Sequence, residues 1–161
     1  MTDKEIKINF IEYTSLGELK PEDRRLAEAA IEALKRAYAP FSNFNVGAAI
    51  RLSNGKIITG ANQENEAFPS GLCAERTAMF YASAEYPEES MEEIAITGGK
   101  NGVMEDYPVT PCGACRQVMA EYQKKGGKPM GVLMIGKKKI WKFRKVEDIL
   151  PLIFDSLRKE A

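Results

Sequence analysis

Apolar residues recur at helical spacing between residues 22 and 38. They stand three or four positions apart on one face, at Leu26, Ala29, Ala30, Leu34 and Ala37. Pro21 suits the first turn of a helix, and Pro40 prevents its continuation. The pattern therefore predicts an amphipathic helix over residues 22–38 that packs one face on a core.

Apolar and β-branched runs further along the chain predict five strands, over residues 46–52, 56–61, 93–97, 131–135 and 139–143. The first two are separated by Ser53-Asn54-Gly55, and Asn-Gly is a strong hairpin signal. Further helices are predicted from Cys73 to about Ser83, from Pro111 or Cys112 to near Lys124, and over 146–150. This alternation favours an α/β fold whose sheet is covered on both faces.

The chain length fits one domain. It has 161 residues and contains no long linker, internal repeat or low-complexity tract. We therefore expect a single domain over residues 1–161.

The charge balance does not favour a polyanionic partner. Lysine and arginine total 23, as do aspartate and glutamate, whereas nucleic-acid binding normally needs a clustered basic face. The run Lys137-Lys138-Lys139 is interpreted as a solvated strand edge. No apolar stretch approaches a membrane span, and the charged first residues lack the apolar core of a signal peptide. With an odd cysteine count, these features predict a cytoplasmic protein without nucleic-acid or membrane partners.

The three cysteines form a pattern typical of a metal site. Cys73 is followed at a distance by Cys112 and Cys115 in Pro-Cys-Gly-Ala-Cys, which supplies three of four ligands for a tetrahedral zinc. The chain has no histidine, so no fourth soft ligand is available within it. An open fourth position is typical of catalytic zinc. Both cysteine blocks fall at predicted helix N-termini, where the helix dipole favours thiolates.

Charged residues beside the cysteines complete the candidate site. Three thiolates on Zn²⁺ leave a net charge of −1, which weakens the metal as a Lewis acid; Arg76 and Arg116 are candidates to offset that charge. Glu75 is not needed as a ligand, so it is free to transfer protons.

Together with further segments, these motifs resemble the cytidine deaminases of the small, all-cysteine type. The resemblance runs over Tyr38–Phe44, Val46–Ala49, Asn62–Asn65, Gly71–Ala78 and Pro111–Met119, with a weaker match at Leu150-Pro151 and Phe154. It implies a three-layer α/β/α sandwich with a mixed five-stranded sheet, a homotetramer, and one Zn²⁺ per subunit. It also implies pyrimidine salvage, with cytidine and deoxycytidine hydrolysed to uridine and deoxyuridine plus ammonia.

The resemblance also implies roles for individual residues. Cys73, Cys112 and Cys115 hold zinc, whose bound hydroxide attacks C4 of the cytosine while Glu75 shuttles protons. Asn62 and Glu64 hydrogen-bond the ribose 3′-hydroxyl. The other implied roles are packing of Phe44 on the pyrimidine, donation from the Ala74 backbone to O2, hydrogen bonding of Arg76 to ligand sulfurs, and closure of Phe154 over a neighbouring subunit's ligand.

Four alternatives remain open at this point. The nearest is an aminohydrolase for another cytosine-like nucleoside, such as the blasticidin-S type or one acting on a modified cytidine. A nucleic-acid deaminase is disfavoured by the balanced charge. A structural zinc or binding module would need a fourth ligand from a partner chain. A redox-active Cys-x-x-Cys would have no use for Glu75.

Overall fold

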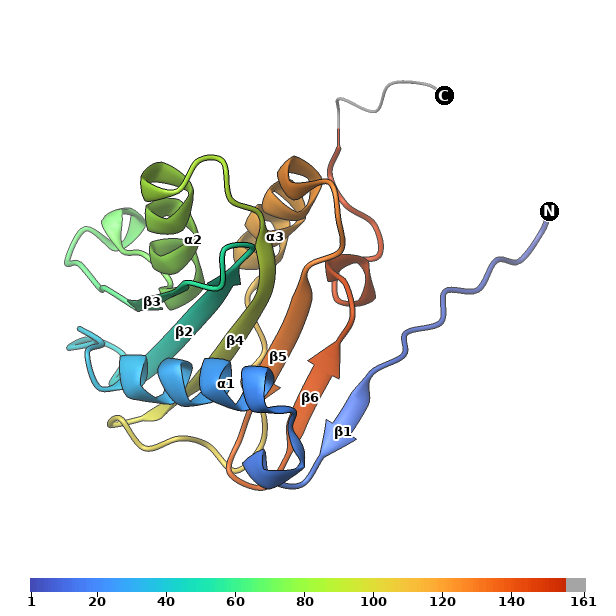
Figure 1. Ribbon diagram of the computed structural model, residues 1–161. Coiled ribbons are helices and arrows are strands. Elements are labelled where there is room, and N and C mark those ends of the chain that lie inside the picture. The colour runs from blue at the N-terminus through green and yellow to red at the C-terminus, as the bar shows by residue number, and fades with distance from the viewer. Residues whose placement is uncertain (156–161) are drawn as a thin grey trace.

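Six strands form one mixed sheet in this computed structural model, which describes residues 1–155. The strands are β1 (Ile11–Tyr13), β2 (Phe44–Leu52), β3 (Ile57–Ala61), β4 (Met91–Lys100), β5 (Gly131–Ile135) and β6 (Ile140–Phe143). Their order across the sheet is β1-β6-β5-β4-β2-β3 (Figure 1). β4 and β5 run parallel, and the other neighbouring pairs are antiparallel. The mixed sheet agrees with the prediction.

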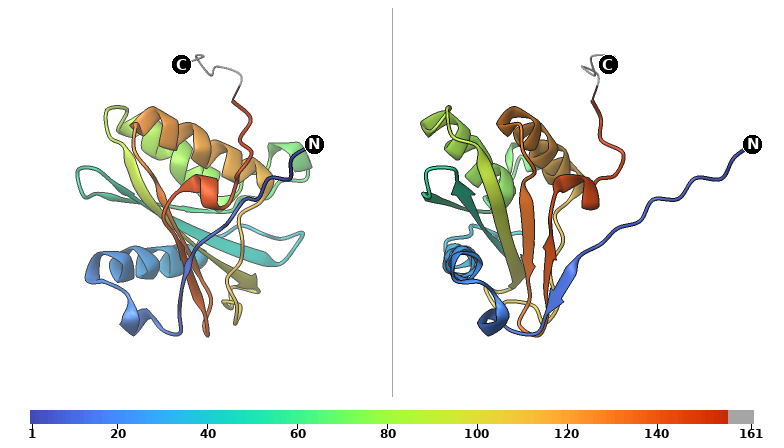
Figure 2. Two further views of the ribbon diagram at one scale, coloured as in Figure 1. Left: turned by 90° about the vertical axis from the view of Figure 1, so that its right-hand side faces the viewer. Right: turned by 45° about the vertical axis from the view of Figure 1, so that its right-hand side comes forward.

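Helices cover both faces of the sheet. α1 (Pro21–Leu34) packs on one face through Leu26, Ala27 and Ala30, which meet Ala49, Ala95 and Leu133. α2 (Ala74–Glu85) and α3 (Gly113–Gly126) pack side by side on the other face (Figures 1 and 2). The three-layer α/β/α sandwich is therefore confirmed.

The prediction of five strands was wrong by one, because β1 forms a sixth. β1 pairs with β6 in the register Ile11↔Lys142 to Tyr13↔Ile140. Just before β1, the ring of Phe10 stacks on Phe143 with centroids 5.2 Å apart. A strand of three residues is too short for its alternation to be recognised, and its partner lies at the far end of the chain.

The first helix ends earlier than expected, at Leu34 rather than residue 38. The N–H of Ala37 bonds the Leu34 carbonyl at 3.3 Å, and the N–H of Tyr38 bonds the Asn62 carbonyl at 2.9 Å. The chain thus leaves the helix to run beside the end of β3. The helix expected over 146–150 is a single 3-10 turn, Val146–Asp148. Among residues 1–155, no helix combines the length and apolarity needed to cross a bilayer.

Gly60 on β3 lets α2 approach the sheet. A Cβ at this position would lie 2.5 Å from the Ala74 oxygen and 2.6 Å from the Ala78 nitrogen, both backbone atoms of α2. Only glycine permits so close an approach. The first turn of α2, which follows Cys73, is thereby held directly on the strand.

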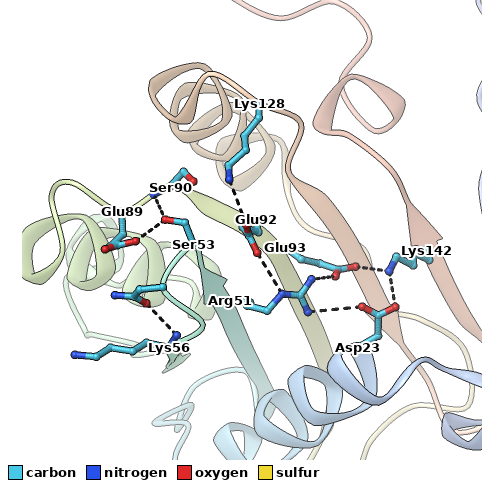
Figure 3. A network of polar contacts seen from close by, with 11 residues as sticks. Asp23, Arg51, Ser53, Lys56, Glu89, Ser90, Glu92, Glu93, Lys128 and Lys142 are labelled. Carbon is cyan, nitrogen blue, oxygen red and sulfur yellow. Dashed lines mark hydrogen bonds and ion pairs between the residues drawn. The ribbon is translucent and has the colours of Figure 1, made fainter.

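A buried ionic cluster holds the first turn of α1 to the same sheet (Figure 3). Asp23 and Glu93 are 2% and 3% exposed, and they share the cations of Arg51 and Lys142. Arg51 Nη2 lies 2.7 Å from a Glu93 oxygen, and Lys142 Nζ lies 3.0 Å from the other. Burial raises the pKa of Glu93, and a hydrogen bond shared with Asp23 raises it further. Burial opposes ionisation of Asp23 too, but the bonds from Lys142 and Glu93 hold its pKa below the usual value.

Candidate metal centre and active site

The N-termini of α2 and α3 carry the three cysteines. Cys73 and Cys112 are the N-cap residues of the two helices, and Cys115 lies in the first turn of α3. The carbonyl of Cys73 accepts from the Thr77 N–H at 2.9 Å, and that of Cys112 accepts from the Arg116 N–H at 3.1 Å. Each cysteine block is therefore oriented by the start of a helix. Packing of α2 against α3 brings the two blocks together.

The three sulfur atoms lie within 4.8 Å of one another. Zn–S bonds of about 2.3 Å in a tetrahedron place sulfurs about 3.8 Å apart, so small side-chain movements suffice to bind the ion. Cys115 is buried, Cys73 is half-buried and Cys112 is exposed, so the cluster faces solvent on one side. The donor set and its spacing fit a zinc ion.

Hydrogen bonds favour a thiolate at Cys73. The Cys115 thiol bonds the Cys73 sulfur and, against the effect of burial, lowers the pKa of Cys73 to about 5, with further help from Arg76. Donation to Cys73, together with burial, raises the pKa of Cys115. Arg76 Nη2 lies 3.4 Å from Cys73 Sγ. A thiolate at Cys73 is ready to bind a cation, and the guanidinium of Arg76 offsets part of the excess negative charge of three thiolates.

Arg116, the other candidate for charge compensation, contacts carbonyl oxygens instead. Its Nε donates to the Pro111 oxygen at 2.8 Å, and its Nη1 donates to the Ile149 oxygen at 2.7 Å. Arg116 therefore ties the segment before Cys112 to the turn after β6.

Glu75 lies in the first turn of α2 and is only 4% exposed. Burial is the main effect raising the pKa of its carboxyl, and the charge at Cys73 adds to it. Hydrogen bonding to Cys115 acts in the opposite direction. The carboxyl thus lies against the sulfur cluster.

Two adjoining hollows open beside the cluster. The inner one, of about 350 Å³, is lined by residues that include Phe44, Asn62, Ala74, Glu75 and Cys112. The outer one, of about 520 Å³, is lined by residues that include Phe41, Glu64, Phe68 and Arg76. Ser42, Asn62 and Cys73 line both. A ligand with a flat ring and a polar appendage could occupy the two together.

The side chain of Asn62 braces the start of β2. Its Oδ1 accepts from the Val46 N–H at 2.7 Å, and its Nδ2 donates to the Phe44 oxygen at 2.9 Å. One amide hydrogen and one lone pair remain for a ligand. The loop-bracing role and a ligand-binding role are therefore compatible.

Glu64 accepts three hydrogen bonds from the loop before β2. They come from the Phe41 N–H at 2.8 Å, the Ser42 N–H at 3.2 Å and the Ser42 hydroxyl. The Ser42 hydroxyl has the largest effect, and with the two N–H groups it lowers the pKa of Glu64. No role was predicted for Ser42, although a serine two residues before a strand is a signal for side-chain capping of a turn.

Phe154 does not line either hollow. Its backbone pairs with Gln117 on α3, with N–O distances of 2.9 and 3.3 Å, and the residue is 77% exposed. Phe154 instead lines a separate hollow beside α3, with Gln117 and Lys124.

Comparison with known proteins agrees with this geometry. The family model described as the cytidine and deoxycytidylate deaminase zinc-binding region matches residues 20–126. Because this match spans more than half of the sequence, the chain belongs to the cytidine and deoxycytidylate deaminase family.

Individual relatives point to the cytidine deaminases within that family. A cytidine deaminase of Halalkalibacterium halodurans is 48% identical over 98 residues, which are 60% of this chain and 68% of that protein. One from Sporosarcina psychrophila is 42% identical over 100 residues, covering 62% of this chain and 68% of the relative. The crystal structure of cytidine deaminase from Burkholderia pseudomallei is 38% identical, with a TM-score of 0.66 over 81% of this chain and 97% of that one.

Proposed function

We propose that this protein hydrolyses the amino group of cytidine and deoxycytidine, giving uridine and deoxyuridine plus ammonia. The observation that carries the proposal is the buried carboxyl of Glu75 beside a three-sulfur cluster, facing a hollow large enough for a pyrimidine. Proton transfer by a positioned carboxyl is what replacement of an amino group by water requires.

Cys73, Cys112 and Cys115 would hold the zinc ion. When bound, zinc supplies a Lewis acid that makes a water molecule at its open position more acidic. The Arg76 guanidinium, 3.4 Å from the Cys73 sulfur, offsets part of the thiolate charge.

Glu75 would move the protons of the reaction. Its carboxylate takes a proton from the attacking water as the oxygen bonds to C4, and delivers that proton to ring N3. It then carries the second water proton to the amino group, the C4–N bond breaks, and ammonia leaves. Burial of Glu75 keeps these transfers out of bulk water.

The hollows would bind the nucleoside in two parts. Phe44 packs against the pyrimidine in the inner hollow, and the backbone N–H of Ala74 donates to O2. Ala74 is the first residue of α2, where N–H groups have no partner within the helix. Asn62 and Glu64 bind the sugar 3′-hydroxyl, Asn62 through its remaining hydrogen-bonding capacity.

The proposal extends to a homotetrameric cytoplasmic enzyme of pyrimidine salvage, built from one domain. Free cysteines arranged as metal ligands support a reducing compartment. The exposed Phe154 supports a subunit contact, in which it would cover a neighbour's ligand.

Ultraviolet-monitored deamination of cytidine and deoxycytidine by the zinc-loaded protein tests the proposal. Glu75→Gln should abolish turnover while zinc content is unchanged. Glu85→Gln, at the exposed end of the same helix, is the matched control and should retain activity. Near-normal turnover by zinc-loaded Glu75→Gln would contradict the role of Glu75. An inactive wild type that holds one zinc would contradict the proposed reaction, and modified cytosine nucleosides would be assayed next.

A further inference from the structure

The hydroxyl of Ser42 joins two parts of the candidate site. It donates to one oxygen of the Glu64 carboxylate, and it accepts from the backbone N–H of Phe44 at 3.0 Å. The backbone N–H of Ser42 donates to the other Glu64 oxygen at 3.2 Å. One residue thus fixes both the outer-hollow carboxylate and the start of β2.

The loop leaves Glu64 one hydrogen-bonding position for a ligand. A carboxylate has about four lone-pair positions, and three are filled by Phe41, the Ser42 backbone and the Ser42 hydroxyl. These donors keep the group ionised, so it can only accept. A hydroxyl that donates to Glu64 therefore approaches from one direction, which the Ser42 hydroxyl helps to set.

The same hydroxyl supplies one of two hydrogen bonds to the Phe44 backbone. Asn43, between Ser42 and Phe44, has a φ of 54°, a left-handed conformation that asparagine adopts more readily than most residues with a side chain. Bonds from both sides hold the turn: Ser42 accepts the Phe44 N–H, and Asn62 donates to the Phe44 oxygen at 2.9 Å. Without the Ser42 hydroxyl, the bond from Asn62 still holds Phe44, whereas Glu64 loses the side-chain donor to one of its oxygens. The larger effect of losing the hydroxyl therefore falls on Glu64.

We propose that Ser42 is a positioning residue that aligns Glu64 for the sugar 3′-hydroxyl, and thereby makes the enzyme selective for nucleosides that carry this group. The inference rests on the proposed function. It predicts that removing the Ser42 hydroxyl lowers kcat/KM more for a substrate with a 3′-hydroxyl than for one without it. A serine that only stabilised the loop would affect both substrates equally.

The chain contains a matched control for the hydrogen bonds of Ser42. Ser53, at the other end of β2, also donates to a glutamate (Glu89) and accepts a backbone N–H (Ser90, at 3.0 Å), as Figure 3 shows. Ser53 lines neither of the hollows beside the cysteines. Ser53→Ala removes the same kinds of bonds away from the candidate site.

The test compares 2′-deoxycytidine with 2′,3′-dideoxycytidine, which differ only in the 3′-hydroxyl. With zinc-loaded Ser42→Ala, we expect KM for deoxycytidine to rise about tenfold and kcat to change little. A rise of this size corresponds to weakening the hydrogen bond between the 3′-hydroxyl and the charged Glu64. For dideoxycytidine we expect kcat/KM to change less than about twofold. Ser42→Thr retains a hydroxyl and should recover most of the discrimination, and Ser53→Ala should behave as wild type.

A binding measurement provides a readout besides turnover. Calorimetry with deoxyuridine and dideoxyuridine should show that Ser42→Ala loses affinity only for the ligand with the hydroxyl. Adding Ser42→Ala to Glu64→Gln should cause no further loss of discrimination, because the two act as one unit. Equal losses for both ligands, or full additivity with Glu64→Gln, would overturn the inference while leaving the deaminase proposal intact. If the zinc-loaded wild type neither deaminates nor binds these nucleosides, the proposed function fails and this inference fails with it.

Discussion

Arg76 and Cys73 form a direct contact one turn apart, with Nη2 3.4 Å from Sγ. Because this guanidinium offsets thiolate charge, we predict that Arg76→Gln lowers kcat about ten- to a hundredfold, the usual cost of losing a group that supports a metal ligand. Zinc content should fall less than activity. Steady-state kinetics and zinc analysis of the same preparation check this, and unchanged kcat would contradict it.

Arg116 provides the contrasting case, since it bonds the carbonyls of Pro111 and Ile149 rather than a sulfur. Arg116→Gln would leave two acceptors without their donor. We therefore predict a lower midpoint of thermal unfolding, by several degrees, and a smaller effect on kcat than that of Arg76→Gln. Parallel melting curves and kinetics of the two variants separate the roles. A larger kcat loss in Arg116→Gln would reverse the assignment.

Removal of zinc should abolish activity reversibly. Three sulfurs within 4.8 Å bind one ion, and soft thiolates select zinc over magnesium. After chelation, we expect Zn²⁺ but not Mg²⁺ to restore turnover. Cys112→Ala removes one of the three ligands and should reduce zinc to well below one per chain, as measured by atomic emission. Full activity in a metal-free sample would exclude the metal mechanism.

Gly60→Ala should separate α2 from the sheet, because the added Cβ would lie 2.5 Å from the Ala74 oxygen. We predict destabilisation of about 1–3 kcal/mol or more, with loss of zinc affinity because Cys73 moves with the helix. Urea unfolding and zinc titration measure the two effects. Gly17→Ala is the control and should be tolerated, because a Cβ there would lie 3.5 Å from the Ser15 hydroxyl oxygen, an ordinary contact distance. Retention of wild-type stability by Gly60→Ala would show that the helix can shift freely.

Lys142→Met should lower the free energy of unfolding, and by more at neutral pH than at acidic pH. It leaves the buried carboxyls of Asp23 and Glu93 without one of their two shared cations, and breaking such a pair costs about 3–5 kcal/mol. Lys138→Met, which removes an exposed pair with Asp106, should lower stability far less, because water and salt screen an exposed ion pair. Urea unfolding of both variants and the wild type at about pH 7 and about pH 5 measures the differences.

The pH dependence of that cost follows from the two carboxyl groups. In the wild type, the depressed pKa of Asp23 gives stability that is present above its unfolded pKa and lost as pH falls through the folded pKa. The raised pKa of Glu93 has the opposite effect. Its contribution to stability is present below the unfolded pKa and is lost as pH rises through the folded pKa. Without Lys142 both folded pKa values rise, and the folded variant binds more protons. Its deficit relative to wild type should therefore shrink toward pH 5, and a deficit independent of pH would contradict this account.

Local patterns predicted most of the fold. The strands expected at 46–52 and 131–135 appear as β2 and β5, and the two cysteine blocks begin helices as expected. These elements are long or carry strong end signals, so short-range patterns suffice to define them. β1 was missed because its three residues gain their strand character from pairing with β6, which no local pattern reveals.

The candidate site was predictable in its residue types but not in its contacts. The spacing of Cys73, Cys112 and Cys115 was enough to expect a zinc cluster, which the sulfur positions fit. The contact of Arg116 with the Ile149 carbonyl depends on the path of the chain after β6, 33 residues later in sequence. The bonds of Ser42 to Glu64 join residues from two loops, so they too required the tertiary structure.

The short outer strand β1 bears on how molecules of this protein behave toward one another. Glu12 in this strand pairs with Lys139 and accepts from the Trp141 indole at 2.9 Å, so β1 covers the outer edge of β6. A brief, charged outer strand discourages strands of other molecules from adding to a sheet. Without the residues before Thr14, β6 would offer its backbone groups to any extended chain nearby. A protein shortened in this way would self-associate at high concentration, although its catalytic groups would be unchanged.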